Sequence, residues 1–561
     1  MKHKNKPKKI YMYKICVVII FSIFIIGILN IAPNYVKSEF TNKTNLVINN
    51  SNVTKNLKKD LIIDKDVVYI STKDIANFFD GNIFYDDKYN QIITSSETVL
   101  ATLKINEEKG TINGAKLDLM SPAIKKDNQY YLPFSEISKN VYNVETKYIK
   151  DTNTVVLTSL DRELIYANSS KNNNIKYKPT FFSKNIEKVK KGDTLVVVKT
   201  SEENSKWTKV TTENGKIGYV KTKTLANKKK VREDFKIKKQ IEGKVSMVWD
   251  YFSKYGSAPK RVGKIKGVNV VAPTFFSLHE KGNGSIIANI GKEGENYIKW
   301  AHANGYKVWP TIRNDEIEQK YISEIMNDYK LRENLINNIL EAVVIFDLDG
   351  INLDFENMYE KDRDMFSRFV IELSPRLKEL GKVLSVDVTA PDGSPDWSLC
   401  YDRNIIGNVA DYIVFMAYDQ TDKNSGKPGT TAGYDWVETN IKKFIKREEI
   451  KEEKIILGIP FYARIWLEED GKIDTRIRNM KELEKMIPSY AKVEWDDSLK
   501  QHYAEYEKDG ITYKVWIEDE KSIKAKLDLV NQYNLAGAAY WEKDRETEEI
   551  WNIVSKELNI K

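Results

Sequence analysis

Short apolar runs alternate with helix-like segments from about residue 244 to the C-terminus. Runs of this length are typical of buried strands, and apolar residues at helical spacing, as over residues 365–380, predict the helices between them. Eight such units in about 310 residues predict an α/β fold, a (β/α)8 TIM barrel. The predicted strands are 268–273, 307–312, 343–347, 350–355, 383–390, 412–418, 454–460 and 535–541.

One connection of the predicted barrel is much longer than the others. Residues 465–523 separate the seventh and eighth strands, and they include the strand-like, β-branched and aromatic run 510–516. We therefore expect a small α+β insertion before the last strand of the barrel domain, which spans residues 244–561.

A weak internal repeat occupies residues 43–160. The segment that begins at Tyr69 resembles the segment that begins at Tyr131, 62 residues later. Each copy continues through an aromatic segment, a turn and an apolar strand. Two related strand–helix–hairpin units, forming an α+β repeat domain, are the simplest interpretation.

Residues 175–226 have the pattern of a small all-β barrel. Two alternating strands flank Asn214-Gly215, and Asn-Gly between such strands is a strong hairpin signal. The next residues, 227–243, are dense in Lys and Arg and poor in apolar side chains, which predicts a solvated linker.

The first 38 residues combine a lysine-rich start with an apolar run over residues 15–31. The lysines are expected to stay in the cytoplasm while the chain that follows crosses the membrane. The run predicts either a retained membrane anchor or a cleaved signal peptide. In both cases the remaining domains work outside the cytoplasm, anchored to the cell membrane or secreted to the cell wall.

The charge and the scarce metal ligands exclude several classes of function. The formal net charge is +8, but six lysines in the first 14 residues supply most of it, so the chain is not expected to bind nucleic acid. Cys16 and Cys400 are the only cysteines, and the four histidines lie far apart in the sequence. We expect no disulfide framework, no metal site and no cofactor.

The segment 349–356, Asp-Gly-Ile-Asn-Leu-Asp-Phe-Glu, contains the candidate chemistry. Because side chains alternate along a strand, Asn352, Asp354 and Glu356 share one face, and Glu356 lies at the carboxyl end, where barrel enzymes have their active sites. Repulsion between the two carboxylates favours a proton on Glu356 near neutral pH. An acid that keeps a proton beside an ionised one fits acid-assisted cleavage of a C–O bond.

This segment resembles the signature of glycoside hydrolase family 18, Asp-Gly-x-Asp-x-Asp-x-Glu, with Asn352 in place of the middle Asp. Three further motifs follow in the family's order, and the resemblance covers about residues 244–561. The motifs are Met416-Ala417-Tyr418-Asp419, then Gly458-Ile459-Pro460-Phe461-Tyr462-Ala463-Arg464, with Ala463 where the family has Gly, and Gly537-Ala538-Ala539-Tyr540-Trp541.

The resemblance implies a retaining mechanism in which the substrate's own acetamido group is the nucleophile, an exception to the usual two-carboxylate scheme. It implies that Glu356 is the acid and later the base, and that Asp354 orients the acetamido N–H. Tyr418 would bond the acetamido oxygen, Asp419 would hold the distorted sugar, and Trp541 would form the apolar floor.

The remaining motif residues are expected to contact substrate. They are Asn352, Asp349, Tyr462 and Arg464, although for Arg464 a structural ion pair is an equal alternative. We expect the amide of Asn352 to donate to Asp354 and so keep it ionised. The Asn form resembles the branch of the family that contains bacterial spore-cortex and cell-wall N-acetylglucosaminidases.

Three functions stay open at this stage. The first is an exported N-acetylglucosaminidase acting on peptidoglycan, and the second is a chitinase or chitin-oligosaccharide hydrolase with the same catalytic residues. The third is a non-catalytic glycan-binding surface protein.

The repeat domain resembles the N-terminal domain of copper amine oxidases, without its copper ligands, and suggests a structural or wall-adhering module. The small barrel resembles bacterial Src-homology-3-type domains, so it either binds cell-wall peptide or is a spacer.

Overall fold

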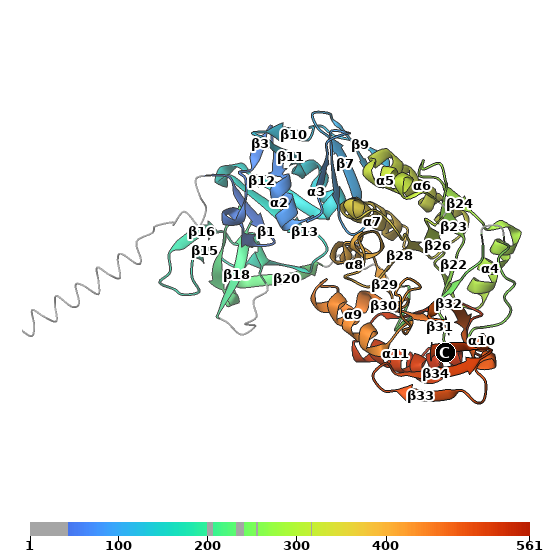
Figure 1. Cartoon of the computed structure of the whole chain (residues 1–561). Helices are drawn as coiled ribbons and strands as arrows, with labels where there is room; N and C mark the ends of the chain where they lie inside the picture. The colour runs from blue at the N-terminus through green and yellow to red at the C-terminus, as the bar shows by residue number, and fades with distance from the viewer. Residues whose placement is uncertain (1–42, 199–205, 232–239, 254–255, 316, 561) are drawn as a thin grey trace, which may run out of the picture. The chain divides into compact units, whose positions relative to one another are not determined.

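The computed structural model describes residues 43–198, 206–231, 240–253, 256–315 and 317–560 of the 561-residue chain (Figure 1). The chain divides into two compact units, Met1–Lys236 and Ile237–Lys561. Within the described ranges, no helix is long and apolar enough to cross a membrane. The anchor or signal segment predicted at residues 15–31 lies outside them and stays a prediction.

The two copies of the N-terminal repeat pair with each other. In each copy a strand leads into a helix, β4 (Val67–Ser71) into α2 (Thr72–Phe78) and β11 (Gln129–Pro133) into α3 (Phe134–Tyr142). The two strands are antiparallel neighbours, with Ile70 opposite Leu132, and both copies contribute to one hydrophobic core. The other strands here are β1 (Asn45–Ile48), β2 (Ser51–Asn52), β3 (Ile62–Asp64), β5 (Phe84–Asp86), β6 (Gln91–Ser95), β7 (Leu100–Lys104), β8 (Lys109–Ile112), β9 (Ala115–Asp118), β10 (Ile124–Lys126), β12 (Val144–Ile149) and β13 (Thr154–Ser159).

A seven-stranded antiparallel sheet follows, and it is longer than the predicted small barrel. Its last strand contains residues 227–231, so the start of the predicted linker is wrong. Those lysines are exposed on a strand that pairs only with β14, and an edge strand tolerates such charges well. The strands are β14 (Leu164–Ser169), β15 (Asn173–Lys176), β16 (Asn185–Val189), β17 (Thr194–Val197), β18 (Trp207–Thr212), β19 (Ile217–Lys221) and β20 (Leu225–Val231).

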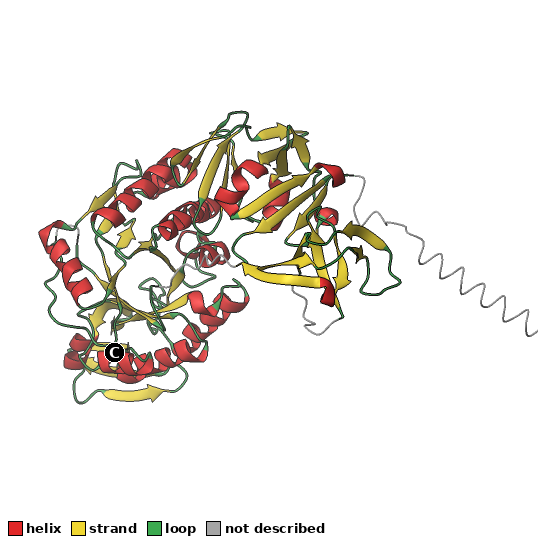
Figure 2. Ribbon diagram, turned by 180° about the vertical axis from the view of Figure 1, so that it is seen from behind, coloured by secondary structure: helices red, strands yellow, loops and turns green. Residues whose placement is uncertain are grey.

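In the C-terminal unit, parallel strands pair in a closed order, which gives the TIM-barrel-like α/β fold that the sequence predicts. Helices lie outside the ring of strands (Figure 2). In order, the strands are β21 (Val245–Asp250), β22 (Val270–Pro273), β25 (Lys307–Val308) continued by β26 (Thr311–Arg313), β27 (Gly350–Asp354), β28 (Val383–Val388), β29 (Tyr412–Met416), β30 (Ile455–Pro460) and β36 (Gly537–Trp541), which pairs back with β21.

The helices around the strands, and two short extra strands, complete the barrel. The helices are α4 (Gly291–Ala303), α5 (Gln319–Asn327), α6 (Tyr329–Ile345), α7 (Arg363–Glu379), α8 (Arg403–Val409), α9 (Tyr434–Lys446), α11 (Glu520–Gln532) and α12 (Ile550–Glu557), and the strands are β23 (Phe276–Leu278) and β24 (Ile286–Ala288).

Two strand assignments made from the sequence need correction. Residues 343–345, predicted as part of a strand, form the last turn of α6, because Val343 extends the buried helical stripe of Ile336 and Ile339. Val344 and Ile345 face solvent and only look like a continuous apolar run. The first barrel strand is β21, all six residues of which are buried.

An antiparallel five-stranded sheet separates β30 from α11. Its first strand begins at Tyr462, directly after β30, so Tyr462 and Arg464 belong to the insertion and not to the barrel wall. Its elements are β31 (Tyr462–Glu469), β32 (Lys472–Asn479), α10 (Met480–Met486), β33 (Lys492–Asp496), β34 (Gln501–Lys508) and β35 (Ile511–Ile517).

Candidate active site

Two cavities meet at the carboxyl ends of the barrel strands. One has a volume of about 380 Å³ and the other about 420 Å³. Both are lined by the same four residues, Asp354, Glu356, Trp397 and Trp541. We call them the Tyr418 cavity, which Asp387, Tyr418, Asp419 and Tyr462 also line, and the Arg313 cavity, which Tyr251, Arg313, Asp315 and Gln319 also line.

The alternation of side chains along β27 places the carboxyl groups in these cavities. Phe355 packs against Phe366 and Phe369 of α7, so its neighbours in sequence, Asp354 and Glu356, face the barrel interior. The two carboxyl groups lie close together, and both residues are partly buried. The result is one open groove with two carboxyl groups at its centre.

The backbone of Glu356 is held by an asparagine from the neighbouring strand end. The Asn314 side chain accepts from the Glu356 N–H at 2.9 Å and donates to the Glu356 carbonyl at 2.7 Å. The Tyr401 hydroxyl donates to the carbonyl of Phe355 at 2.7 Å. These bonds fix the point at which β27 ends, and with it the direction in which the Glu356 carboxyl projects.

The environment raises the pKa of both carboxyl groups. Burial raises the pKa of Asp354 to about 6, against the opposing effects of its hydrogen bond with Glu356 and of the nearby Arg313 charge. Burial raises the pKa of Glu356 well above its usual range, and the Asp354 carboxylate raises it further. Near neutral pH, therefore, Asp354 is the ionised partner and Glu356 the protonated one.

Asn352 has a different role from the expected one. Its amide donates to Asp387 at 2.7 Å and to Ser385 at 3.1 Å, and its carbonyl oxygen accepts from Trp249 and Thr311. The partners lie on three other barrel strands, β21, β26 and β28, and none is Asp354. The prediction that Asn352 donates to Asp354 is therefore wrong. Asn352 is fully buried, and its amide and its carbonyl oxygen are already hydrogen-bonded to these other residues.

Tyr418, Asp419 and Tyr462 line the wall of the Tyr418 cavity. The Tyr462 hydroxyl donates to Asp419 at 2.9 Å, and the Tyr418 and Tyr462 rings are 6.2 Å apart between centroids. Arg464 lies behind them, 3.6 Å from Asp419, and donates to Thr475 at 3.0 Å. Burial raises the pKa of Asp419 despite these partners.

The aromatic floor is held by contacts around Trp541. The Trp541 ring lies 5.7 Å from that of Trp249 and 6.1 Å from that of Tyr251, measured between centroids. Trp397, an exposed tryptophan in the short π-helix Pro395–Leu399 after β28, lines both cavities. Aromatic faces beside polar groups suit a sugar, because its C–H face packs on a ring while its hydroxyls form hydrogen bonds.

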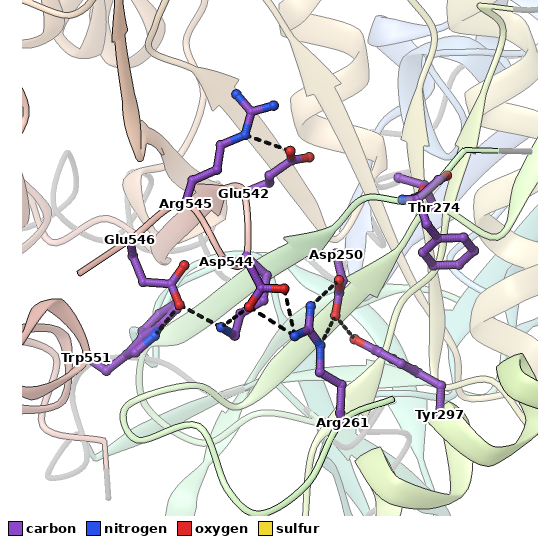
Figure 3. Close-up of polar contacts among 11 residues, drawn as sticks. Asp250, Arg261, Thr274, Tyr297, Glu542, Asp544, Arg545, Glu546 and Trp551 are labelled. Atoms are coloured by element: carbon purple, nitrogen blue, oxygen red, sulfur yellow. Dashed lines mark hydrogen bonds and ion pairs between the residues drawn. The ribbon is translucent and has the colours of Figure 1, made fainter. Parts of the chain in front are cut away.

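A polar network supports the loop that follows Trp541 (Figure 3). Arg261 bridges Asp250, at the end of β21, and Asp544, with N–O distances of 2.7 and 2.8 Å. Tyr297 donates to Asp250 at 2.9 Å, and Lys543 pairs with Glu546 at 2.6 Å. The end of the first barrel strand and the loop after the last one are thereby joined.

The comparisons with known proteins identify the family of the C-terminal unit. The model of the glycosyl hydrolases family 18 matches residues 245–546, more than half of the chain. The chain belongs to glycosyl hydrolase family 18. It is therefore a glycosidase, as the motifs predict. The copper amine oxidase N-terminal domain matches residues 47–157 and the bacterial SH3 domain matches residues 173–226, which confirms both N-terminal resemblances.

Several relatives of this family 18 enzyme are Bacillus proteins. The uncharacterized glycosylase YvbX of Bacillus subtilis is 29% identical over 303 residues, which are 52% of this chain and 84% of the relative. The cortical fragment-lytic enzyme of Bacillus subtilis is 21% identical over 292 residues, 51% of this chain and 67% of the relative. Among solved structures, a chitinase from Chromobacterium violaceum has 23% identity and a TM-score of 0.49, covering 56% of this chain and 99% of its own.

One motif residue of the family 18 signature lies away from the cavities. Asp349 precedes β27 at its amino end, where its carboxylate contacts His302 and Lys307 at 2.9 and 2.8 Å and accepts from the Val308 N–H. These bonds lower its pKa although burial raises it. The expected substrate contact of Asp349 does not fit this position, which instead ties β27 to β25 at the opposite end of the barrel.

Three residues of the family 18 site were missed by sequence reasoning. Asp387 is a lone acid in the apolar strand β28 and lines the Tyr418 cavity; burial, with the nearby Asp354 charge, raises its pKa well above the usual range. Its inward position in a buried strand was a signal that could have been used. Arg313 ends β26 and Asn314 follows it, and nothing in their local sequence marks them. No cluster of three or more His, Cys, Asp or Glu side chains in the described ranges could hold a metal ion.

Proposed function

We propose that this family 18 enzyme is an exported N-acetylglucosaminidase that cleaves β-1,4 bonds after N-acetylglucosamine in peptidoglycan, with retention of configuration. The observation that carries this proposal is the pair formed by Asp354 and Glu356 at the junction of two cavities. A glycan chain lying across that junction presents one glycosidic oxygen to Glu356, with sugars on both sides.

In the first step the N-acetylglucosamine occupies the Tyr418 cavity. Glu356 gives its proton to the glycosidic oxygen while the acetamido carbonyl oxygen forms a bond to the anomeric carbon, and the bond to the leaving sugar breaks. The product is a cyclic oxazolinium ion. Asp354 accepts from the acetamido N–H and balances the positive charge, and Tyr418 donates to the acetamido oxygen.

In the second step Glu356 works in reverse. Its carboxylate takes a proton from water, the water oxygen bonds to the anomeric carbon, and the acetamido oxygen leaves. Attack from the side vacated by the first sugar restores the original configuration, and Glu356 regains its proton. The family's catalytic roles of Glu356, Asp354 and Tyr418, with Asp419 and Trp541 as substrate contacts, are therefore proposed for this chain.

A buried atom supports the role of Asp354. Its Oδ1 is buried and has no hydrogen-bond partner among the described residues. An unsatisfied carboxylate oxygen costs about 1–3 kcal/mol or more, and such a cost is expected where a ligand supplies the partner. An acetamido N–H in the Tyr418 cavity is the donor that the mechanism places there.

The choice of peptidoglycan rests on the N-terminal domains and on the relatives. A bacterial SH3 domain precedes the barrel, and one relative is named for lysis of cortical fragments. We propose that the SH3 domain binds wall peptide, that the repeat domain is a structural or wall-adhering module, and that the chain acts outside the cytoplasm. A chitin-oligosaccharide hydrolase is the second candidate, because human di-N-acetylchitobiase is 24% identical over 311 residues.

Product analysis tests this function. Purified peptidoglycan and chitin oligomers would be digested in parallel, the new reducing ends reduced with borotritide, and the labelled sugar alcohols separated. The proposal expects labelled glucosaminitol derivatives from peptidoglycan, with the β-anomer formed first in a time-resolved NMR spectrum. Labelled muramitol, or hydrolysis of chitin oligomers alone, would contradict it.

The pH dependence of kcat/KM follows from the two raised pKa values. Asp354 has a pKa of about 6, so it is increasingly protonated below that value and loses the charge that the oxazolinium needs. Glu356 keeps its proton beyond neutral pH. We expect a bell-shaped profile whose acidic limb lies near pH 6 and whose basic limb lies above neutrality. Full activity maintained down to pH 4 would contradict the assignment of the acidic limb to Asp354.

The two hydrogen bonds between the Asn314 side chain and the Glu356 backbone yield a further prediction. Asn314→Ala removes both bonds to the Glu356 backbone, and we expect kcat to fall about 10-fold to 100-fold because the carboxyl is no longer held in register. Thermal unfolding should shift by only a few degrees. An unchanged kcat in a folded variant would show that β27 alone positions the acid.

A further inference from the structure

The Arg313 cavity has features that the proposed chemistry at Glu356 does not use. It lies on the side of Glu356 away from Tyr418, so the sugar that leaves in the first step occupies it. Its walls include the aromatic rings of Tyr251, Trp397 and Trp541. Polar side chains from β26 and α5 project beside those rings. This composition suits a sugar that carries an additional polar substituent.

Arg313 is the only cationic side chain among the described residues that line either cavity. It ends β26, where it is the register partner of Asp354 on β27. The residue is only 8% exposed, and its guanidinium lies 5.1 Å from the centre of the Tyr251 ring. A buried arginine at the end of a barrel strand has a fixed position, so it can recognise an acceptor with little loss of side-chain entropy.

The hydrogen-bonding capacity of Arg313 is not filled. Its Nη1 donates to Asp315 at 2.7 Å, but its Nε is buried and has no partner among the described residues. The Asp315 side chain is 51% exposed, so only the carboxylate end of this ion pair is solvated. A guanidinium in this state has donors available for an oxygen atom brought by a ligand.

Gln319, the first residue of α5, provides a second, independent observation. Its side chain lines the same cavity, and its Nε2 is also buried without a partner among the described residues. Two residues that line one cavity, one from β26 and one from α5, therefore each carry an unsatisfied donor. Buried donors are nearly always paired in proteins, so a ligand with oxygen acceptors is the expected partner.

We infer that Arg313 and Gln319 form a specificity site for the lactyl substituent of an N-acetylmuramic acid residue on the leaving side of the cleaved bond. Muramic acid differs from glucosamine by this 3-O-lactyl group, whose oxygens are carboxylate acceptors when free and an amide carbonyl when joined to peptide. Chitin offers only a hydroxyl there. The inference rests on the proposed function, and it makes this cavity the place where peptidoglycan is distinguished from chitin.

Acidic groups face Arg313 from both neighbouring segments, and they shape the preference. Asp354, Glu356 and Asp315 line the same cavity, and Glu356 keeps its proton near neutral pH. The remaining carboxylates offset the arginine charge. We therefore expect the amide form of the lactyl group to bind at least as well as the free carboxylate, because a neutral acceptor adds no repulsion.

The test compares two substrates in a set of variants of the full chain. One is the tetrasaccharide of alternating N-acetylglucosamine and N-acetylmuramic acid, with the lactyl group either free or joined to alaninamide, and the other is chitotetraose. The readout is the ratio of kcat/KM for the muramic substrate to that for chitotetraose. We expect Arg313→Gln to lower the ratio about 10-fold or more, Arg313→Lys to lower it less, and Gln319→Ala to lower it about 3-fold.

A ratio is needed because Arg313 also affects Asp354. Loss of its charge should slow both substrates, but only the lactyl contact changes the preference between them. Lys320→Gln is the matched control. Lys320 is exposed and lies next to Gln319 in the sequence, but it lines neither cavity. This substitution also removes one positive charge, and the ratio should not change.

The outcomes separate the inference from the proposed function. If the wild-type enzyme cleaves the muramic substrate but Arg313→Gln and Gln319→Ala slow both substrates by the same factor, the specificity site is wrong and the function stands. If the wild-type enzyme cleaves chitotetraose and not the muramic substrate, the proposed function itself fails. A folded Gln319→Ala variant keeps the test valid even if Arg313→Gln unfolds.

Discussion

Replacing Glu356 with Gln is expected to lower kcat on peptidoglycan about 10³-fold or more. Gln has the same shape, and the Asn314 bonds to the backbone of residue 356 are kept, so the groove should be preserved. What is lost is the proton for the leaving sugar and the base for water. Release of reducing sugar from purified wall, with circular dichroism to check folding, measures the effect.

The proton donor role can be separated from a structural one with an activated substrate. A dinitrophenyl leaving group departs without protonation, so kcat/KM on a dinitrophenyl N-acetylglucosaminide should fall far less in Glu356→Gln than on peptidoglycan. Glu360→Gln, an exposed acid four residues further on, is the control and should behave as the wild type. Equal losses on both substrates would remove Glu356 from the acid role.

The inward face of β27 could be predicted because strand geometry leaves few alternatives. Once residues 350–354 are a strand, Asn352, Asp354 and Glu356 must share a face, and the barrel fold puts the carboxyl end at the active site. The same rule applies to Asp349, which precedes the strand. Its place at the amino end of β27 follows from the direction of the chain. The substrate contact was expected only because Asp349 belongs to the motif.

The partners of a buried side chain could not be predicted from the sequence. Asn352 is two residues from Asp354, and the sequence offered that neighbour as the natural acceptor of its amide. The structure instead gives it partners on β21, β26 and β28, which come from positions 33 to 103 residues away. Contacts of that kind depend on the register between strands, which local sequence does not specify.

Assignments from the sequence failed where a local pattern fitted more than one kind of structure. Residues 343–347 are apolar enough for a strand, but 343–345 form the last turn of α6, and only Val343 of these three is buried. Residues 227–231 are polar enough for a linker, but as an edge strand they need one partner and no buried side chains. In both places the local pattern fitted two kinds of secondary structure, and contacts with the rest of the fold determined which one forms.

Asp387 changes how the acidic centre is understood. The family's middle Asp is Asn352 here, yet a third acid is still present, because Asp387 on the next strand accepts from Asn352 at 2.7 Å and lies near Asp354. Burial raises the pKa of Asp387 well above its usual range, and its protonated form adds no negative charge below the groove. The negative charge that the oxazolinium requires is then concentrated on Asp354.

Asp354→Asn is therefore expected to lower kcat about 10²-fold or more, with little change in thermal stability. The amide keeps the shape and can still accept from an acetamido N–H, but it carries no charge to stabilise the oxazolinium. The variant should also lose the acidic limb of the pH profile near pH 6, because the group responsible no longer titrates. Measurement of kcat/KM from pH 4 to 9 provides both results.

A stable mimic of the cyclic intermediate distinguishes this role from simple substrate binding. N-acetylglucosamine thiazoline reproduces the bicyclic shape and becomes cationic on protonation, so its inhibition constant should rise in Asp354→Asn by much more than KM does. Asp364→Asn removes an exposed acid from the first turn of α7 and should change neither value. If thiazoline binds both proteins equally well, or if the acidic limb persists in the variant, Asp354 does not supply the charge, and the acid that does must be sought at Asp387 or Asp419.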